Sequence, residues 1–331
     1  MLYISDKSTD PYFNLAEEEF LLKEMTEDIF RLWRNSPSII VGRYQNTIAE
    51  IDSEYTKSHN IPVVRRLSGG GAVFHDLGNL NFTFIQNLEQ NQNLDTSRMF
   101  RYFTSPILEA LQSLGVNAEL QGRNDLAIDG MKFSGNAICI HKDRILMHGT
   151  LMFKVSKADL SKALRPRPEK FIGKAVKSNV KRVTNISDHL KDKDPDILWF
   201  TDFLGKYVCS RIKDITPYRF TEDQLKKINH LKDSRYATDE WNFGKSPQYT
   251  FSNIKRFPKG IVELYLKTKN GRITDLDIRG DYFFSRPTEE FTRTIIGTPH
   301  TREDIQKKIG TLDTGAYFAG IDSEDIVSLF F

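Results

Sequence analysis

Apolar and polar residues follow two periods along this chain, one typical of helices and one typical of strands. Helical periodicity covers residues 12–28 and 96–114, and the second stretch ends at Gly115, where a helix C-cap is expected. Four large apolar side chains form the predicted core side of the first helix: Leu15, Phe20, Leu21 and Leu22. Shorter helical patterns lie at about 49–59, 156–164, 195–212 and 221–232.

Strand patterns and tight turns account for much of the remainder. Asp129-Gly130 and Asn270-Gly271 are strong hairpin signals, because these pairs accept the left-handed backbone of a two-residue turn. Predicted strands lie at 30–33, 38–41, 62–66, 72–75, 80–85, 126–128, from 131 onward, and at 145–153, 249–256, 261–268 and 272–279. Hairpins outnumber β-α-β alternation, so we predict an α+β fold with a mixed or mostly antiparallel sheet.

A new series of strand patterns, followed by short helices, begins after Trp241-Asn242-Phe243-Gly244. We therefore expect a domain boundary near 245–250, with a large domain over 1–245 and a small α+β domain over 246–331. The length of 331 residues suits this division.

Composition favours a globular protein of a reducing compartment. Hydrophobic residues make up 39% and charged residues 27% of the chain. No apolar run approaches the ~18 residues of a membrane span, and the N-terminus lacks the pattern of a secretory signal. Two cysteines cannot form a disulfide framework, so we expect the cytoplasm.

Positive charge is concentrated in one segment. Residues 165–182 carry a net charge of +6 in a chain whose total is +3. Two prolines and a glycine interrupt this segment, which favours a loop over a helix. It is either a solvated loop or a flap that closes over a polyanion such as a nucleotide.

Three consecutive glycines, Gly69–Gly71, follow Arg65 and Arg66. Glycines let the backbone approach a ligand and direct N–H groups at an anion, and we expect the two arginines to add charge beside them. The Walker pattern is absent, and Phe74 stands where a dinucleotide fingerprint needs its last glycine. Taken alone, the run is either a flexible turn or an anion-binding loop.

Lys132 follows the Asp129-Gly130 turn among small residues, which leave space beside its ammonium group. A compact cation there suits the position between a carboxylate and an α-phosphate. Asn124-Asp125 and His148-Gly149 lie on the strands that flank it. A solvated lysine and a buried structural histidine are the plainer interpretations of each residue alone.

Together these motifs resemble the lipoate–protein ligase family, in its two-domain form within the biotin/lipoate ligase superfamily. The resemblance rests on RRLSGGGAVFHDLGNLNFTF, GRNDLAIDGMKFSGNA and MHGTL, with FNLAEEEFLL, LWRN, VGRYQN and EWNFGKSP, and it covers essentially the whole chain. It implies a mixed-sheet catalytic domain shared with biotin ligases and a small α+β C-terminal accessory domain. The GRGRxGR-type loop of biotin ligases is absent.

The resemblance implies a nucleotide-binding enzyme that converts lipoate and ATP to lipoyl-AMP and pyrophosphate, with Mg²⁺ as part of the ATP substrate. The lipoyl group then passes to a lysine of an acceptor protein. Expected acceptors are the glycine-cleavage H protein or a 2-oxoacid dehydrogenase acyltransferase subunit; nucleic acid and membranes are not expected partners. Acceptor identity and the choice between lipoate and octanoate stay open.

The resemblance also implies residue roles, with Lys132 as the catalytic residue. The ATP or adenylate would be bound by Arg66, Gly71, Ala72, Val73, Phe74 and Lys132. The lipoate would be bound by Lys132, Ser68, Gly69, Gly70, His75, His148 and Gly149. Supporting residues would be Asn124, Asp125 and Ser134. No metal ligand is assigned, and the basic segment near 165–182 would correspond to the family's adenylate-binding loop.

Three other functions compete with this interpretation. An acyl-carrier-protein-dependent octanoyl or lipoyl transferase shares the fold, and some such enzymes carry the acyl group on a cysteine. Cys139 does not match that cysteine's position. A lipoate-binding module without catalysis is disfavoured by the intact Lys132 and glycine run. Nucleic-acid binding is disfavoured because Phe171 is the only aromatic residue within the basic segment.

Overall fold

The computed structural model describes residues 1–5, 7–45, 47–88, 95–156, 183–191, 195–243, 251–269 and 271–331. The basic segment 165–182 and the expected boundary at 245–250 lie outside these residues, as does nearly all of the helix expected at 156–164. None of the helices in the described ranges has the length and apolar character needed to cross a membrane.

The largest sheet has eight strands and is mixed. In spatial order they are β11 (Thr216–Pro217), β1 (Leu2–Ser5), β2 (Ile29–Trp33), β6 (Asn79–Asn87), β10 (Arg144–Met152), β9 (Met131–His141), β8 (Asp125–Ile128) and β7 (Ala118–Gln121). Strand β1 runs parallel to β2 and β11, whereas the other pairs are antiparallel. The α+β class with a mixed sheet is confirmed.

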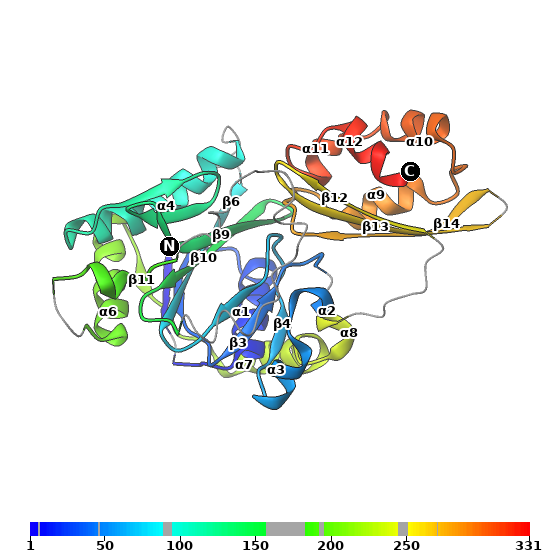
Figure 1. Ribbon diagram of the computed structural model, residues 1–331. Coiled ribbons are helices and arrows are strands. Elements are labelled where there is room, and N and C mark those ends of the chain that lie inside the picture. The colour runs from blue at the N-terminus through cyan, green and yellow to red at the C-terminus, as the bar shows by residue number, and fades with distance from the viewer. Residues whose placement is uncertain are drawn as a thin grey trace.

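Two three-stranded sheets complete the strand inventory of the described residues. One has the order β4 (Val63–Arg65), β3 (Ser38–Val41), β5 (Val73–His75), and it carries the glycine run between β4 and β5. The other has the order β12 (Phe251–Phe257), β13 (Gly260–Lys269), β14 (Arg272–Gly280), and in Figure 1 it lies with the last helices of the chain.

Some helices pack on the two faces of the large sheet, and those at the end of the chain pack on the last sheet. Before β12 they are α1 (Pro11–Glu24), α2 (Thr47–Glu50), α3 (Ser53–Ser58), α4 (Thr96–Ser113), η3 (Ile186–His189), α6 (Ile197–Arg211), α7 (Glu222–Leu231), η4 (Lys232–Tyr236) and α8 (Asp239–Asn242). After β14 they are α9 (Thr288–Ile295), α10 (Arg302–Ile309), α11 (Thr314–Tyr317), α12 (Ser323–Val327) and η5 (Ser328–Phe330). The helix expected at 49–59 is two short helices, α2 and α3.

Separate hydrophobic cores hold these layers together. Apolar residues of α4 and α6 pack on one side of the large sheet, and those of α1 and α7 form another cluster with it. A further core joins β12–β14 to the helices that follow them. The hairpin prediction at Asp129-Gly130 is confirmed, since both residues have positive φ, 50° and 73°.

Three consecutive glutamates of α1 are buried, which the predicted amphipathic helix did not foresee. Glu17 pairs with Arg31 of β2 through contacts of 2.7 Å, and both side chains are 0% exposed. Arg31 also donates to the backbone and side-chain oxygens of Asn14. Helix α1 is therefore fixed to the sheet by a bidentate ion pair inside the core.

Replacing Arg31 by methionine is expected to lower the free energy of unfolding by about 3–5 kcal/mol, because Glu17 then stays buried without its charge partner. The matched control is Lys206→Met, since the Lys206–Asp202 pair is 77% and 62% exposed and contributes little. Urea unfolding of both variants measures the difference. Equal, small losses would show that the buried pair does not hold α1.

Candidate active site

One cavity lies where α1, the small sheet β4-β3-β5 and strands β9 and β10 meet. Its walls combine apolar side chains, the glycine run and a few polar groups. The lining residues are Leu15, Trp33, Ile40, Arg66, Gly70, Gly71, Ala72, Val73, His75, Asn81, Asn124, Lys132, Gly135, Asn136, Ala137, His148, Gly149 and Thr150. Apolar walls with a few convergent polar groups are typical of a small-molecule site.

Arg66 shapes the glycine run from inside. Its Nη2 donates to the carbonyl oxygens of Gly69 and Gly71 at 2.6 and 2.9 Å, and its Nη1 donates to that of Ile40 at 3.1 Å. Gly70 has φ +89°, a conformation that only glycine adopts without strain. Burial lowers the pKa of Arg66 to about 10, with Glu18 opposing the shift, so the guanidinium stays charged at neutral pH. The loop is thus held in one shape before any ligand binds.

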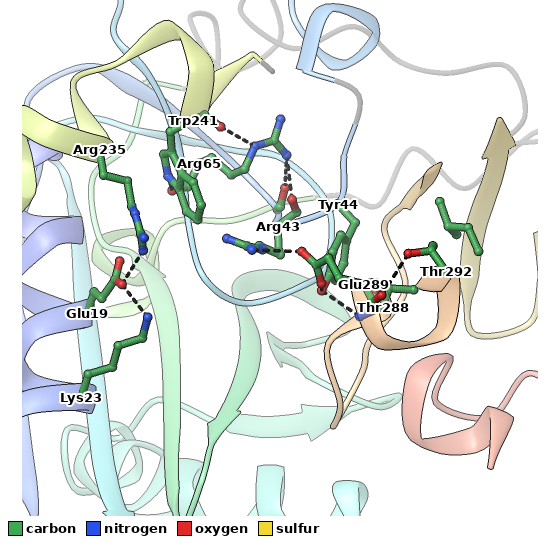
Figure 2. Close-up of polar contacts among 12 residues, drawn as sticks. Glu19, Lys23, Arg43, Tyr44, Arg65, Arg235, Trp241, Thr288, Glu289 and Thr292 are labelled. Carbon is green, nitrogen blue, oxygen red and sulfur yellow. Dashed lines mark hydrogen bonds and ion pairs between the residues drawn. The ribbon is translucent and has the colours of Figure 1, made fainter. Parts of the chain in front are cut away.

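Arg65 does not stand beside the same cavity, contrary to expectation. Successive side chains of a strand point to opposite faces, so Arg65 at the end of β4 is directed away from Arg66. Its guanidinium donates to the carbonyl oxygen of Gly42 at 2.8 Å. It also donates to that of Trp241 at 2.9 Å, as Figure 2 shows.

Lys132 is the second cation in the cavity lining, beside Arg66. Its Nζ lies 2.8 Å from Asp125 Oδ1, with 30% of the lysine side chain and 10% of the aspartate side chain exposed. A register shift in the β8–β9 pair between Leu126 and Ala127 brings Lys132 opposite Ala127. The chain returns beside Lys132 after residue 182, where Val183 pairs with it and Thr184 N–H donates to its carbonyl oxygen.

A chain of buried hydrogen bonds runs behind the glycine run. Arg66 Nε donates to Ser68 Oγ at 3.0 Å, and Ser68 Oγ lies 2.6 Å from His148 Nε2. His148 Nδ1 in turn lies 3.0 Å from Glu18 of α1. Burial alone would raise the pKa of Glu18, but His148, Thr83 and Arg31 together lower it below its ordinary value. The carboxylate therefore stays charged and orients the histidine ring.

Two buried donors at the cavity have no hydrogen-bond partner among the described residues: His75 Nε2 and Asn81 Nδ2. His75 Nδ1 accepts from Asn35 Nδ2 at 3.1 Å, because the Asn35 oxygen already accepts from Asn14. The ring proton is therefore on Nε2. Burial, then the charges of Arg66 and His148, lower the pKa of His75 to about 3, so the ring is neutral. A ligand with acceptor atoms would satisfy both donors.

The cavity brings together ten of the residues that the sequence singled out: Arg66, Gly70, Gly71, Ala72, Val73, His75, Asn124, Lys132, His148 and Gly149. Five others lie outside its lining: Ser68, Gly69, Phe74, Asp125 and Ser134. Phe74 packs in a cluster with Ile39, Val41, Ile51 and Val63. Ser68 and Asp125 contact lining residues, and Gly69 lies against Tyr282 and Phe284 near the third sheet.

Sequence reasoning missed the other lining residues. Trp33 comes from the recognised LWRN motif, and its Nε1 donates to Thr83 at 2.9 Å, but no local signal distinguishes it from a core tryptophan. Asn136 and Asn124 exchange side-chain and backbone hydrogen bonds of 2.6 to 3.0 Å, which clamp β9 to the start of β8. A Cβ at Gly149 would collide with Asn136 and Phe82.

The lipoyl protein ligase A/B catalytic domain model matches residues 10–208, and the bacterial lipoate protein ligase C-terminus model matches residues 246–330. The chain belongs to the lipoate–protein ligase family. It is 40% identical to lipoate–protein ligase 1 of Staphylococcus aureus over 99% of both chains. It is 39% identical to the lipoate-protein ligase LplJ of Bacillus subtilis over 100% of both chains.

Solved ligase structures share the fold. The Plasmodium falciparum LipL1 complex with lipoate has a TM-score of 0.73, with 29% identity and 94% of each chain covered. A lipoate-protein ligase A bound with ATP has a TM-score of 0.60, with 27% identity over 74% of this chain and 97% of that one. The bipartite Thermoplasma acidophilum ligase, described with its E2 lipoyl domain, has a TM-score of 0.63, with 29% identity over 76% and 98%.

The described ranges contain no group of three or more His, Cys, Asp or Glu side chains that could hold a metal ion. In this ligase, acidic groups at the cavity are few and paired: Asp125 with Lys132, and Glu18 with His148.

The neutral state of His75 predicts a pH dependence of stability. Its folded pKa of about 3 lies below the ordinary histidine value, so between the two the unfolded chain binds an extra proton. Stability should therefore fall with falling pH, by up to about 1.4 kcal/mol per pH unit from this residue. His75→Gln should reduce the slope of the free energy of unfolding against pH between about pH 6 and about pH 5. Urea unfolding at several pH values measures it, and an unchanged slope would contradict a neutral His75.

Proposed function

We propose that this ligase activates lipoate with ATP and joins the lipoyl group to a lysine of a lipoyl-domain acceptor protein. The observation that carries the proposal is the placement of Lys132 opposite a preformed glycine loop in one cavity. Full-length similarity to lipoate–protein ligases supports it, as do a lipoate-bound and an ATP-bound structural relative. The E2 lipoyl domain of the Thermoplasma system supports the acceptor class.

The first step joins two anions. A carboxylate oxygen of lipoate attacks the α-phosphorus of ATP, the bond to the bridging oxygen breaks, and pyrophosphate leaves. Lys132 neutralises the charge that develops on the α-phosphate. To do so, its ammonium group must leave Asp125 and contact the substrate. Backbone N–H groups of the loop at Gly70 and Gly71 bind the nucleotide anion, while Arg66 holds their shape.

Mg²⁺ enters this reaction as part of the ATP substrate. Protein sites for Mg²⁺ on nucleotides use one or two carboxylates together with phosphate oxygens. Asp125 is a carboxylate of this kind beside Lys132, and it becomes available when the lysine turns to the substrate. The ion supplies charge neutralisation on the phosphates.

The apolar part of the cavity suits the acyl tail. Leu15, Trp33, Ile40, Val73 and Ala137 provide walls without charge. In the second step, a neutral lysine amine of the acceptor attacks the acyl carbon of the adenylate. The bond to AMP breaks, an amide forms, and the amine loses a proton. No side-chain nucleophile is required.

The remaining assignments complete the proposal. Residue roles are otherwise those implied by the family motifs. Two assignments are changed: Gly70 binds the nucleotide anion instead of lipoate, and Ser68 and His148 form with Glu18 a chain that positions Arg66. The division into a catalytic domain over 1–245 and an accessory domain over 246–331 is supported by a separate core for the last sheet. Acceptors are an H protein or an acyltransferase subunit, and the compartment is the cytoplasm.

The form of the transferase alternative that carries its acyl group on a cysteine requires an accessible thiolate. Cys139 is 8% exposed and packs among apolar residues outside the cavity lining. Burial raises the pKa of its thiol to about 12. A thiol that stays protonated is a poor nucleophile. This environment favours the adenylate route.

Lys132→Ala should reduce lipoyl-AMP and pyrophosphate formation by more than about tenfold, the equivalent of about 1.4 kcal/mol in the barrier. The melting temperature should move little, because the lysine is partly exposed. Lys142→Asn is the matched control: it removes a lysine from the far turn of the same strand, where φ is +54° and asparagine is tolerated. A Lys132→Ala enzyme as active as the control would refute the role of Lys132.

Cys139→Ser should keep ligase activity, with a modest loss of stability from placing a hydroxyl in an apolar cluster. Pyrophosphate release and intact mass of the enzyme after reaction with acyl donor are the measurements. Loss of activity together with an acyl group trapped on the wild-type thiol would support the transferase instead.

A further inference from the structure

A second cavity lies between β14 and the segment that follows β3. It is lined by Arg43, Tyr44, Gln45, Arg65, Phe243, Asp277, Ile278 and Arg279, and we call it the seam cavity. Its volume of about 150 Å³ exceeds the ~10–15 Å³ that one water needs. It shares no lining residue with the active-site cavity. The two cavities are therefore separate, with Arg65 directed to one and Arg66 to the other.

Positive charge exceeds negative charge around the seam cavity. Arg279 Nε pairs with Asp277 at 2.6 Å, and Arg43 Nη2 pairs with Glu289 at 3.1 Å (Figure 2). Arg65 has no carboxylate partner among the described residues; its guanidinium donates to carbonyl oxygens and to Thr47. Burial, then the charges of Arg279 and Arg43, lower the pKa of Arg65 to about 9. Three arginines thus face two carboxylates.

A buried donor at this cavity also lacks a partner. Gln45 is 1% exposed, and its Nε2 makes no hydrogen bond within the described part of the chain. The orientation of the amide is fixed, because Gly42 N–H donates to Gln45 Oε1 at 2.8 Å. The NH₂ group must therefore be the unpaired end. An unsatisfied buried donor destabilises the folded state, and an acceptor atom in the cavity would remove that penalty.

We propose that the seam cavity binds a phosphate-class oxyanion, inorganic phosphate or pyrophosphate. The anion would accept from Gln45 Nε2 and balance the charge of Arg65, the one guanidinium group of the three that has no carboxylate partner among the described residues. The cavity walls come from both sides of a seam that the 2.6 Å hydrogen bond from Gly280 N–H to the Tyr44 carbonyl oxygen already joins. A bound anion would therefore stabilise this arrangement of the last sheet against the rest of the chain. If the proposed function holds, pyrophosphate released by the first step is a source of that anion.

Calorimetric titration of the full chain with sodium phosphate and with sodium pyrophosphate, without Mg²⁺, tests the site. All measurements use the Lys132→Ala background, which removes the lysine ammonium group from the active-site cavity. Gln45→Glu keeps the acceptor for Gly42 and places a carboxylate where the anion would bind. Arg279→Gln removes one cation from the opposite wall. Arg272→Gln is the control, since Arg272 is an exposed residue of the same strand.

We expect binding in the Lys132→Ala background and in the control, and at least about tenfold weaker binding in Gln45→Glu and in Arg279→Gln. Gln45→Glu should also melt no lower than its parent, because its carboxylate substitutes for the anion. The phosphate and pyrophosphate titrations show which anion the cavity prefers. No binding of either anion up to about 10 mM, or equal affinity in all variants, would overturn the proposal.

Discussion

Burial of charge on α1 is the constraint on which the rest of the structure depends. Helix α1 is covered on nearly all sides, so three consecutive glutamates must each find a partner inside the protein. Glu17 pairs with Arg31 of the large sheet, and Glu18 pairs with His148 behind the glycine run. Glu19 accepts from Tyr236. It also pairs with Arg235 and Lys23, as Figure 2 shows. One turn of helix thereby fixes its position against the sheet, the candidate active site and the region after α7.

The buried glutamates of α1 also make the candidate site rigid. The hydrogen-bond chain from Glu18 through His148 and Ser68 ends on Arg66, which holds the carbonyl oxygens of the glycine run. Loop N–H groups held in place before binding need no reorganisation when charge develops on a bound phosphate. Lys132, in contrast, is paired with Asp125 and partly exposed, so it is the group that must move. The site therefore combines a rigid glycine run, which binds the anion, with a lysine side chain that can change its partner.

Turn motifs and periodic patterns in the sequence predicted the secondary structure well, because turns and helices depend mainly on residues that are close together along the chain. The Asp129-Gly130 hairpin and the helix at 96–114 follow from turn chemistry and periodicity, and both are confirmed. Burial of Glu17–Glu19 depends on partners far along the chain, which periodicity cannot reveal. The same holds for Arg65, whose direction follows from where β4 ends, and for Trp33, whose place at the cavity depends on the packing of α1. The motif residues that converge on the cavity were predictable because the family resemblance already carries long-range information.

The central claim is that this chain uses ATP to attach lipoate to a lipoyl-domain protein. The most direct measurement is the intact mass of apo H protein and of an apo acyltransferase lipoyl domain after incubation with the enzyme, lipoate and Mg²⁺. We predict a gain of one lipoyl group on at least one acceptor when ATP is present, and none when ATP is omitted. An acceptor that gains its acyl group from an acyl-carrier protein without ATP, while lipoate and ATP give nothing, would contradict it.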